Sequence, residues 1–386
     1  MSDFIFITFY SSLITYHLSL IGVSGMENII NHKDIIGFGA LNTDLIYEIE
    51  NIESLRSVFP LVESGGEYFV DSDEKCSSLQ ALLKKVGKLK VQSGGGQAAN
   101  TATALARMGF KTGFIGKVGC DAYGDFLLHE LNGVDTSRIV RTGKSGICLI
   151  VVDNSKERTN FVIPNCNDTL NEAEIDLSYI ANTEFLHLSS FVGAKPFQTQ
   201  KKILEYIPSN VKISFDPGEL YSRKGLQELL PIIQRSYIIF LTEKEILYLL
   251  GLDYKIPPTP LFKGGDYQGA KELLNCGPSI VVCKRGREGS MVFTRTETIE
   301  MPAQKVQAVD ATGAGDVYAA GFLAGLLVGA TLDECAFFAT RVASLSVTGF
   351  GREKYPDVEY RYAHLRAVLP DFRSLKDFGS LHIFKE

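Results

Sequence analysis

The stretch VDATGAGDVYAAGFLAGLLVGA, residues 309–330, decides the fold of this chain. A Gly-Ala-Gly turn at Gly313–Gly315 leads directly into a long apolar run, which predicts a buried helix that begins at the turn. The first N–H groups of a helix have no partner within the helix, and the helix dipole makes that end positive. The stretch therefore predicts an anion-binding turn, suited to phosphate, at the start of a core helix.

Two carboxylates flank this turn. Asp316 lies in the first turn of the predicted helix, where an acid complements the helix dipole. An acid beside an anion-binding turn also suits a base that takes a proton from an attacking hydroxyl. Asp310 lies six residues earlier and could form the turn or bind a cation. The residues alone leave these roles open.

A second glycine cluster, SGGGQAAN at residues 93–100, precedes a predicted helix over Asn100–Met108. Glycines before a helix allow a close approach of the backbone to another group, because no Cβ intrudes. A tight turn would use the same residues. This cluster alone does not decide between a binding site and a turn.

Short apolar, β-rich runs alternate with helical patterns through most of the chain. This alternation predicts βαβ units, and so an α/β fold with a mainly parallel sheet buried on both faces. The predicted strands are Ile35–Gly39, Thr112–Val118, Phe185–Ser189, Val211–Asp216, Tyr237–Leu241 and Ile280–Lys284. The predicted helices between them include Phe197–Tyr206, Glu243–Leu250 and Tyr267–Leu274.

Two regions depart from the alternation. Ile147–Asp153 and Arg158–Ile163 surround Asn154-Ser155 and predict a hairpin. Residues 45–92 are charged and irregular, with a short helical pattern near Ser77–Val86. Parts of 45–92 and of 147–163 are predicted to form a small β lid at the carboxyl ends of the strands, where open α/β sheets bind ligands. Lys255–Asp266, rich in Pro and Gly, predicts a surface loop.

Composition and missing motifs exclude several classes of protein. The net charge of −6 and the absence of a basic run argue against nucleic-acid binding. Seven scattered cysteines without a CxxC pair argue against a zinc site and favour reduced thiols in the cytoplasm. The phosphate-binding pattern GxxxxGK[ST] is absent, and Asn42 replaces the third glycine of GxGxxG. An NAD-dependent Rossmann oxidoreductase is therefore the weaker alternative.

The N-terminus is apolar from Phe4 to Val23 but has no Lys or Arg before Lys33, so the charged flank of a signal or anchor is missing. Met26 begins a segment that leads directly into a strand. We therefore expect residues 1–33 to be an extension outside the fold and residues 34–386 to form the domain, with no membrane attachment. Residues 1–25 in particular could be an upstream stretch that is never translated.

Taken together, these motifs resemble the ribokinase-like, or PfkB, family of carbohydrate and nucleoside kinases. The resemblance covers residues 35–352 and depends on the order of its motifs as much as on any one of them. The matching segments are Gly39–Asp44, Gly95–Asn100, Pro164–Leu170, Asp216–Gly218, Val281–Gly289 and Asp310–Asp316.

The resemblance implies a three-layer α/β/α fold with a mainly parallel central sheet and a small β lid. It implies transfer of the γ-phosphoryl group of ATP to a hydroxyl of a sugar, with Asp316 as the general base. Gly313, Ala314 and Gly315 would form the anion hole for the transferring group. The implied substrate-binding residues are Asn42, Asp44, Gly95, Gly96 and Asn100.

The resemblance also implies sites for ATP and its ions. The implied ATP-binding residues are Thr242, Glu245, Lys284, Gly286 and Gly289. Glu245 belongs to an N-x-x-E element associated with Mg²⁺ through water, although Thr242 stands here where Asn is usual. Asp310 and the backbone of Ala311 match the monovalent-cation site of potassium-activated members. ATP and Mg²⁺ are thus expected as cofactors, and K⁺ stays open.

The identity of the acceptor stays open between two classes. The hairpin sequence resembles that of sugar kinases, whereas the long segment between Asp44 and Gly95 is similar to adenosine-kinase-type relatives. Gln97 replaces a lysine that is common in ribokinases. We expect a sugar acceptor, with a nucleoside as the alternative and a non-catalytic ligand-binding protein as a remoter one. The exposed lid edge leaves a homodimer open.

Overall fold

The computed structural model describes residues 32–155, 157–252 and 268–368. A large sheet forms its centre, in the strand order β15-β14-β13-β12-β11-β10-β1-β5-β6, with β7 paired to β5. Its parallel strands include β1 (Lys33–Phe38), β5 (Thr112–Val118), β10 (Thr183–Ser189), β11 (Lys212–Asp216), β12 (Ser236–Thr242) and β13 (Ile280–Lys284). Short parallel strands β6 (Val134–Asp135) and β7 (Ile139–Arg141) extend one edge, and antiparallel β14 (Ser290–Phe293) and β15 (Thr298–Met301) extend the other.

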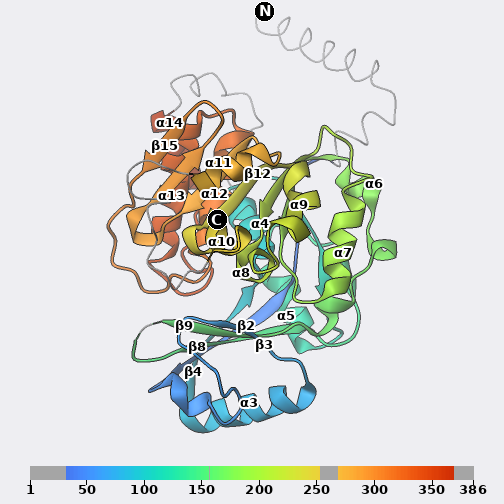
Figure 1. Ribbon diagram of the computed structural model, residues 1–386, viewed down its shortest axis with the longest axis vertical. Helices are drawn as coiled ribbons and strands as arrows, with labels where there is room; N and C mark the ends of the chain where they lie inside the picture. Colours follow the sequence, from blue (N-terminus) through green and yellow to red (C-terminus); the bar gives the residue numbers. More distant parts are fainter. Residues whose placement is uncertain (1–31, 156, 253–267, 369–386) are drawn as a thin grey trace, which may run out of the picture.

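Helices cover both faces of this sheet, so the main body has three layers (Figure 1). Along β12, Ile238 and Phe240 pack into one hydrophobic cluster while Ile239 and Leu241 pack into the other. This alternation is the period-2 geometry of a strand buried on both sides, and it explains why the predicted strands are continuous apolar runs. The predicted mainly parallel α/β fold is therefore confirmed.

The helices divide between the two faces. One face carries α4 (Gln97–Arg107), α12 (Ala314–Leu327), α13 (Leu332–Ser346) and α14 (Val358–Val368). The other carries α6 (Leu177–Ile180), α7 (Ala194–Ile203), α8 (Gly218–Ser222), α9 (Leu226–Arg235), α10 (Glu243–Leu249) and α11 (Gln268–Asn275). Helix α5 (Ala122–Glu130) packs with α4 beside β5. The main body also contains the 3₁₀ turns η2 (Asn165–Thr169), η3 (Glu172–Glu174) and η4 (Gly286–Glu288), the last between β13 and β14.

A second sheet forms the lid. Its strand order is β3-β9-β8-β2-β4, built from β3 (Glu67–Phe69), β9 (Arg158–Ile163), β8 (Gly146–Val152), β2 (Asn42–Ile49) and β4 (Gly87–Gly95). The predicted hairpin is confirmed as antiparallel β8 and β9. The predicted helical piece is α3 (Asp73–Val86), which covers the outer face of the lid together with η1 (Ile52–Leu55) (Figure 1).

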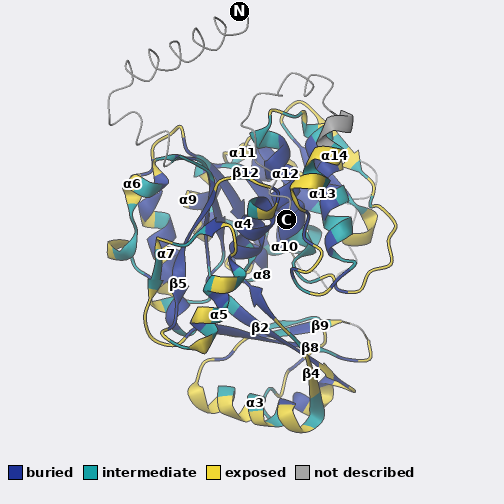
Figure 2. Ribbon diagram, turned by 180° about the vertical axis from the view of Figure 1, so that it is seen from behind, coloured by how far each residue is buried: buried dark blue, intermediate teal, exposed yellow. Residues whose placement is uncertain are grey.

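The two faces of the lid sheet differ in what they contact. Leu45, Tyr47 and Leu149 point outward and pack against Leu79 and Leu83 of α3. Because side chains alternate along a strand, the intervening residues of β2 and β8 point the other way. They face the main body, and Figure 2 shows the lid below the buried helices α4 and α12.

Some boundaries differ from the sequence prediction. Strand β1 begins at Lys33, which pairs with Thr183, so the fold includes one residue assigned to the N-terminal extension. Residues 1–31 of that extension and the predicted loop Lys255–Asp266 lie outside the described residues. The first glycine cluster is also divided: Gly94 and Gly95 end β4, and only Gly96 precedes α4.

All seven cysteines are free thiols in the structure. Among the helices of the described ranges, none combines the length and apolar character that crossing a membrane requires.

Candidate active site

A cavity of about 330 Å³ lies between the inner face of the lid and the carboxyl ends of the central strands. Its walls come from both sheets and from the first turns of several helices. Nine of the residues expected from the sequence line it: Asn42, Asp44, Gly96, Asn100, Glu245, Lys284, Gly313, Gly315 and Asp316. The position agrees with the rule that open α/β sheets bind ligands beyond the carboxyl ends of their strands.

The predicted anion-binding turn opens into this cavity at the start of α12. Gly313 caps the helix with φ of 72°, a left-handed conformation that glycine adopts without strain. No side chain caps this end of the helix. A Cβ at Gly315 would lie 3.3 Å from Nζ of Lys284, so the turn and an ammonium group are neighbours. Backbone donors, the helix dipole and Lys284 therefore create a positive corner in the cavity.

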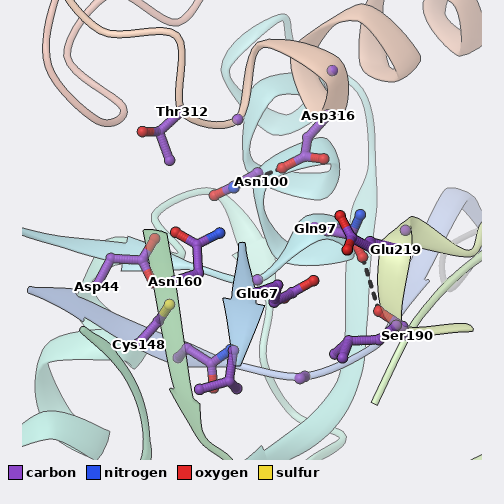
Figure 3. Close-up of a pocket in the computed structure, with 18 of the residues that line it drawn as sticks. Asp44, Glu67, Gln97, Asn100, Cys148, Asn160, Ser190, Glu219, Thr312 and Asp316 are labelled. Carbon is purple, nitrogen blue, oxygen red and sulfur yellow. Dashed lines mark hydrogen bonds between the residues drawn. The ribbon is translucent and has the colours of Figure 1, made fainter. Parts of the chain in front are cut away.

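Asp316 lies one residue beyond this turn, and its side chain points into the cavity (Figure 3). Its Oδ2 accepts a hydrogen bond of 2.8 Å from Nδ2 of Asn100. Burial, and next the charge of Asp216, raise the pKa of Asp316 to about 7, although the Asn100 hydrogen bond and Lys284 act in the opposite direction. A carboxyl group that titrates near neutral pH suits a general base better than an ordinary aspartate does.

Asn100 is itself held by Arg352, a residue that the sequence analysis did not single out. Nε of Arg352 donates to Oδ1 of Asn100 at 3.1 Å, and Nη1 donates to the carbonyl of Glu130 at 3.0 Å. Because the guanidinium only donates, it fixes the amide oxygen of Asn100 on its own side. The amide nitrogen must then face Asp316.

Lys284 forms a buried ion pair with Asp216, the first residue of the Asp216–Gly218 segment. Nζ and Oδ2 are 2.5 Å apart, and the two side chains are only 12% and 1% exposed. Burial alone would lower the pKa of Lys284, but the carboxylates of Asp216 and Glu245 raise it well above its usual range. Lys284 is therefore a permanently charged group beside the anion-binding turn.

Glu245 and Thr242 form the start of α10. Thr242 N–H donates to Oε2 of Glu245 at 2.7 Å, and Oγ1 of Thr242 accepts from the Glu245 N–H at 3.3 Å. Thr242 therefore acts as the N-cap of α10 in a capping box, and it does not line the cavity. Glu245 does line it, and burial raises the pKa of its carboxyl.

Asn42 and Asp44 project from the start of β2 on the lid side of the cavity. Oδ1 of Asn42 accepts a hydrogen bond of 3.0 Å from Asn167. Asp44 lies directly over Gly95, where a Cβ would come within 2.2 Å of either carboxylate oxygen. Burial, partly offset by Arg352, raises the pKa of Asp44 to about 7.

The remaining expected residues lie outside the cavity lining: Gly95, Ala314, Thr242, Gly286, Gly289, Asp310 and Ala311. Gly95 makes room for Asp44, as described above. Gly286 and Gly289 have φ of 56° and 93° and shape the turn between β13 and β14. Asp310 is paired with Arg158 of β9. These positions support the site instead of facing it.

Seven further residues with polar or thiol side chains line the cavity and were not expected from the sequence to be site residues: Glu67, Gln97, Cys148, Asn160, Ser190, Glu219 and Thr312 (Figure 3). The pairing of β2 with β8 places Cys148 opposite Asp44, so a known register would have identified it. Gln97 accepts a hydrogen bond of 3.1 Å from Ser190 Oγ, which links α4 to the loop after β10. Glu67 comes from β3, where no motif marks it.

Comparisons with known proteins agree with this geometry. The model for "pfkB family carbohydrate kinase" matches residues 62–356. An uncharacterised sugar kinase of Archaeoglobus fulgidus is 34% identical over 65% of this chain and 98% of its own length. An ATP-dependent ribose-1-phosphate kinase of Halopiger xanaduensis is 30% identical over 69% of this chain and 85% of its own length. In structure, an adenosine kinase of Sinorhizobium meliloti superposes with a TM-score of 0.74 at 21% identity, covering 87% of this chain and 99% of that one.

Proposed function

The chain belongs to the pfkB family of carbohydrate kinases, and we propose that it transfers the γ-phosphoryl group of ATP to a hydroxyl of a sugar. The observation that carries this proposal is the position of Asp316. Its carboxyl faces the cavity one residue beyond Gly313–Gly315 and is oriented by Asn100. A base and an anion-binding turn at one point are what phosphoryl transfer to a hydroxyl requires.

In this mechanism Asp316 accepts the proton of the acceptor hydroxyl while the hydroxyl oxygen attacks the γ-phosphorus of ATP. The bond between that phosphorus and the bridging oxygen breaks, and ADP leaves with the electron pair. Oδ2 of Asp316 is held by Asn100, so Oδ1 is the oxygen directed to the hydroxyl. The backbone N–H groups of Gly313 and Gly315 supply donors to the transferring group, whereas that of Ala314 donates to the Ala311 carbonyl, and Lys284 adds positive charge.

Glu245 is the residue that would hold Mg²⁺, through a bridging water. Its Oε2 is used in the capping box with Thr242, but its carboxyl still lines the cavity and leaves Oε1 for a water. When bound with ATP, Mg²⁺ neutralises charge that develops on the phosphates. The residues present fit this role, since a carboxylate is a suitable partner for a magnesium-bound water.

The lid side of the cavity favours an acceptor without a phosphate group. Its lining residues are Asn42, Asp44, Glu67, Cys148, Ile150, Asn160 and Val162, which include two carboxylates and no cation. Burial, followed by the charges of Glu219 and Glu245, raises the pKa of Glu67 to about 7. A phosphate placed here would meet further repulsion, whereas sugar hydroxyls can donate to carboxylates and exchange hydrogen bonds with amides.

A nucleoside acceptor is the second candidate, because one strip of the cavity is apolar. Ile150 and Val162 of the lid and Val192 of the main body lie in one hydrophobic cluster and line the cavity. Such a strip could contact the face of a base while Asn42 and Asp44 bind the ribose. The test therefore includes both acceptor classes.

The experiment is an ATP-consumption assay with ribose, fructose, ribose 1-phosphate, fructose 6-phosphate and adenosine as acceptors. We expect an unphosphorylated sugar to give the highest kcat/KM. With that acceptor, Asp316→Asn should lower kcat by at least about 10²-fold while ATP still raises the unfolding temperature of the variant. Full activity of Asp316→Asn would refute the assignment of the base.

A further inference from the structure

An arginine of the lid reaches across the cavity rim to the loop that carries the anion-binding turn. Arg158, the first residue of β9, forms an ion pair with Asp310 through Nη2 and Oδ1. The Asp310 side chain is 1% exposed and that of Arg158 is 25% exposed. The pair is therefore mostly removed from water, where a charge–charge contact is stronger than at the surface.

The Asp310 carboxylate has further donors around it. The Thr312 N–H donates to Oδ1 at 2.7 Å, and the Gly351 N–H donates to Oδ2 at 3.1 Å. Asp310 thus joins three segments: the lid, the turn that leads to Gly313, and the loop after α13. Any group that neutralises its charge also helps to fix the anion-binding turn.

These contacts do not fit the monovalent-cation site that the resemblance assigns to Asp310 and Ala311. The Ala311 carbonyl accepts a hydrogen bond of 3.2 Å from the Ala314 N–H, which occupies one of its two acceptor positions. Oδ1 of Asp310 is shared between a guanidinium and a backbone donor. A K⁺ ion bound to this carboxylate would lie beside the permanent charge of Arg158, and like charges at such separations repel strongly in a buried site.

We propose that Arg158 supplies the positive charge that a monovalent cation supplies in potassium-activated relatives, so that this protein works without K⁺. The guanidinium pairs with Asp310 and thereby positions the turn at Gly313. Since Arg158 belongs to the lid, that charge reaches Asp310 only when the lid lies over the cavity. Arg158 is a positioning residue here, acting on the anion-binding turn through Asp310.

The test compares the full-length protein with Arg158→Gln and Arg158→Lys in KCl, NaCl and choline chloride at one ionic strength. One readout is the unfolding temperature, which does not depend on catalysis; the other is ATP consumption with the best acceptor. For the parent protein, we expect the unfolding temperature to differ by less than about 1 °C among the salts. Its rate of ATP consumption should differ by less than about twofold. The unfolding temperature of Arg158→Gln should be higher in KCl than in choline chloride by about 2 °C or more, and K⁺ should partly restore its activity.

Two controls separate this effect from general loss of charge. Arg158→Lys keeps a cation and should remain insensitive to K⁺. Lys90→Gln removes an exposed lid cation that pairs with Glu48, and it should also show no response to K⁺. A parent protein stabilised or activated by K⁺ would overturn the proposal, and so would an Arg158→Gln variant that folds but ignores K⁺. The parent measurement decides the matter even if Arg158→Gln does not fold.

Discussion

Asn100 donates a hydrogen bond to Asp316 across 216 residues of sequence, from the first turn of one helix to the first turn of another. The bond joins the two glycine clusters of the sequence, since α4 follows Gly96 and α12 follows Gly313. Its donor is oriented by Arg352 and its acceptor is the proposed base. The orientation of the base therefore depends on a chain of three side chains.

Removing this hydrogen bond should change the pH dependence of the reaction. Asn100 stabilises the ionised form of Asp316, so Asn100→Ala should raise the pKa of Asp316 beyond its value of about 7. Because the base must be ionised, kcat/KM falls as the pH drops through this pKa. The acidic limb of the profile should move upward by about one pH unit in the variant, given the usual strength of a hydrogen bond to a charged group.

Thr101→Val is the matched control for this measurement. The Thr101 hydroxyl donates to the backbone carbonyl of Asp316 at 3.1 Å, so it contacts the same residue but not its carboxylate. The control should therefore leave the acidic limb in place. An unchanged profile in Asn100→Ala would show that the hydrogen bond does not set the titration of the base.

Substitution of Lys284 should affect both stability and nucleotide binding. Lys284→Met leaves the Asp216 carboxylate buried without its cation, and breaking a buried pair in this way typically costs about 3–5 kcal/mol. We expect a lower free energy of unfolding in urea and a higher KM for ATP. Lys202→Met, which removes an exposed cation paired with Glu172, should change neither by a comparable amount.

Much of the fold could be predicted from the sequence because the strands of the central sheet are buried on both faces. Runs such as those in β12 have no polar face, and this pattern is typical of a parallel sheet. The lid strands were harder to place, since β3 has only three residues and depends on pairing with β9. Local sequence contains no information on such pairing.

One part of the site could be predicted from a local pattern, and a further part, with Asn42, Asp44, Glu245 and Lys284, only from the resemblance to a family. Gly313 and Asp316 were identified because they lie at a helix start beside a Gly-Ala-Gly turn, and Asn100 because its segment matches a motif of the family. Arg352 and Arg158 act through contacts more than 100 residues away in sequence, with Asn100 and Asp310 respectively. No local pattern marks an arginine for such a contact, so only the folded chain reveals it.

Gly95→Ala should weaken acceptor binding through Asp44. A Cβ at position 95 would lie 2.2 Å from Oδ1 of Asp44, so the carboxylate must move. We expect a KM for the acceptor at least about fivefold higher, with the KM for ATP nearly unchanged. In an Asp44→Ala background the same Gly95→Ala change should have little further effect, because the displaced group is gone. Additive effects in this double-mutant cycle would contradict the contact.

The raised pKa of Asp316 also predicts how the site affects stability. Burial raises this pKa from 3.8 to about 7, so between these values the folded protein binds more protons than the unfolded chain does. The stabilisation that this protonated carboxyl contributes to the fold is fully present below about pH 4 and is lost as the pH rises through 7. An ionised Asp316 therefore destabilises the fold at pH 8, the pH range in which its carboxylate can accept a proton.

Asp316→Asn should remove this dependence, because an amide cannot ionise. The unfolding temperature of the variant should exceed that of the parent by a few degrees at pH 8, and the two should nearly coincide at pH 4. Glu359→Gln, a charge removal on α14 at an exposed position, controls for the change in net charge. A difference that is equally large at pH 4 and pH 8 would mean that the Asp316→Asn change stabilises the fold through packing, and the proposed ionisation of Asp316 would then have no support from stability.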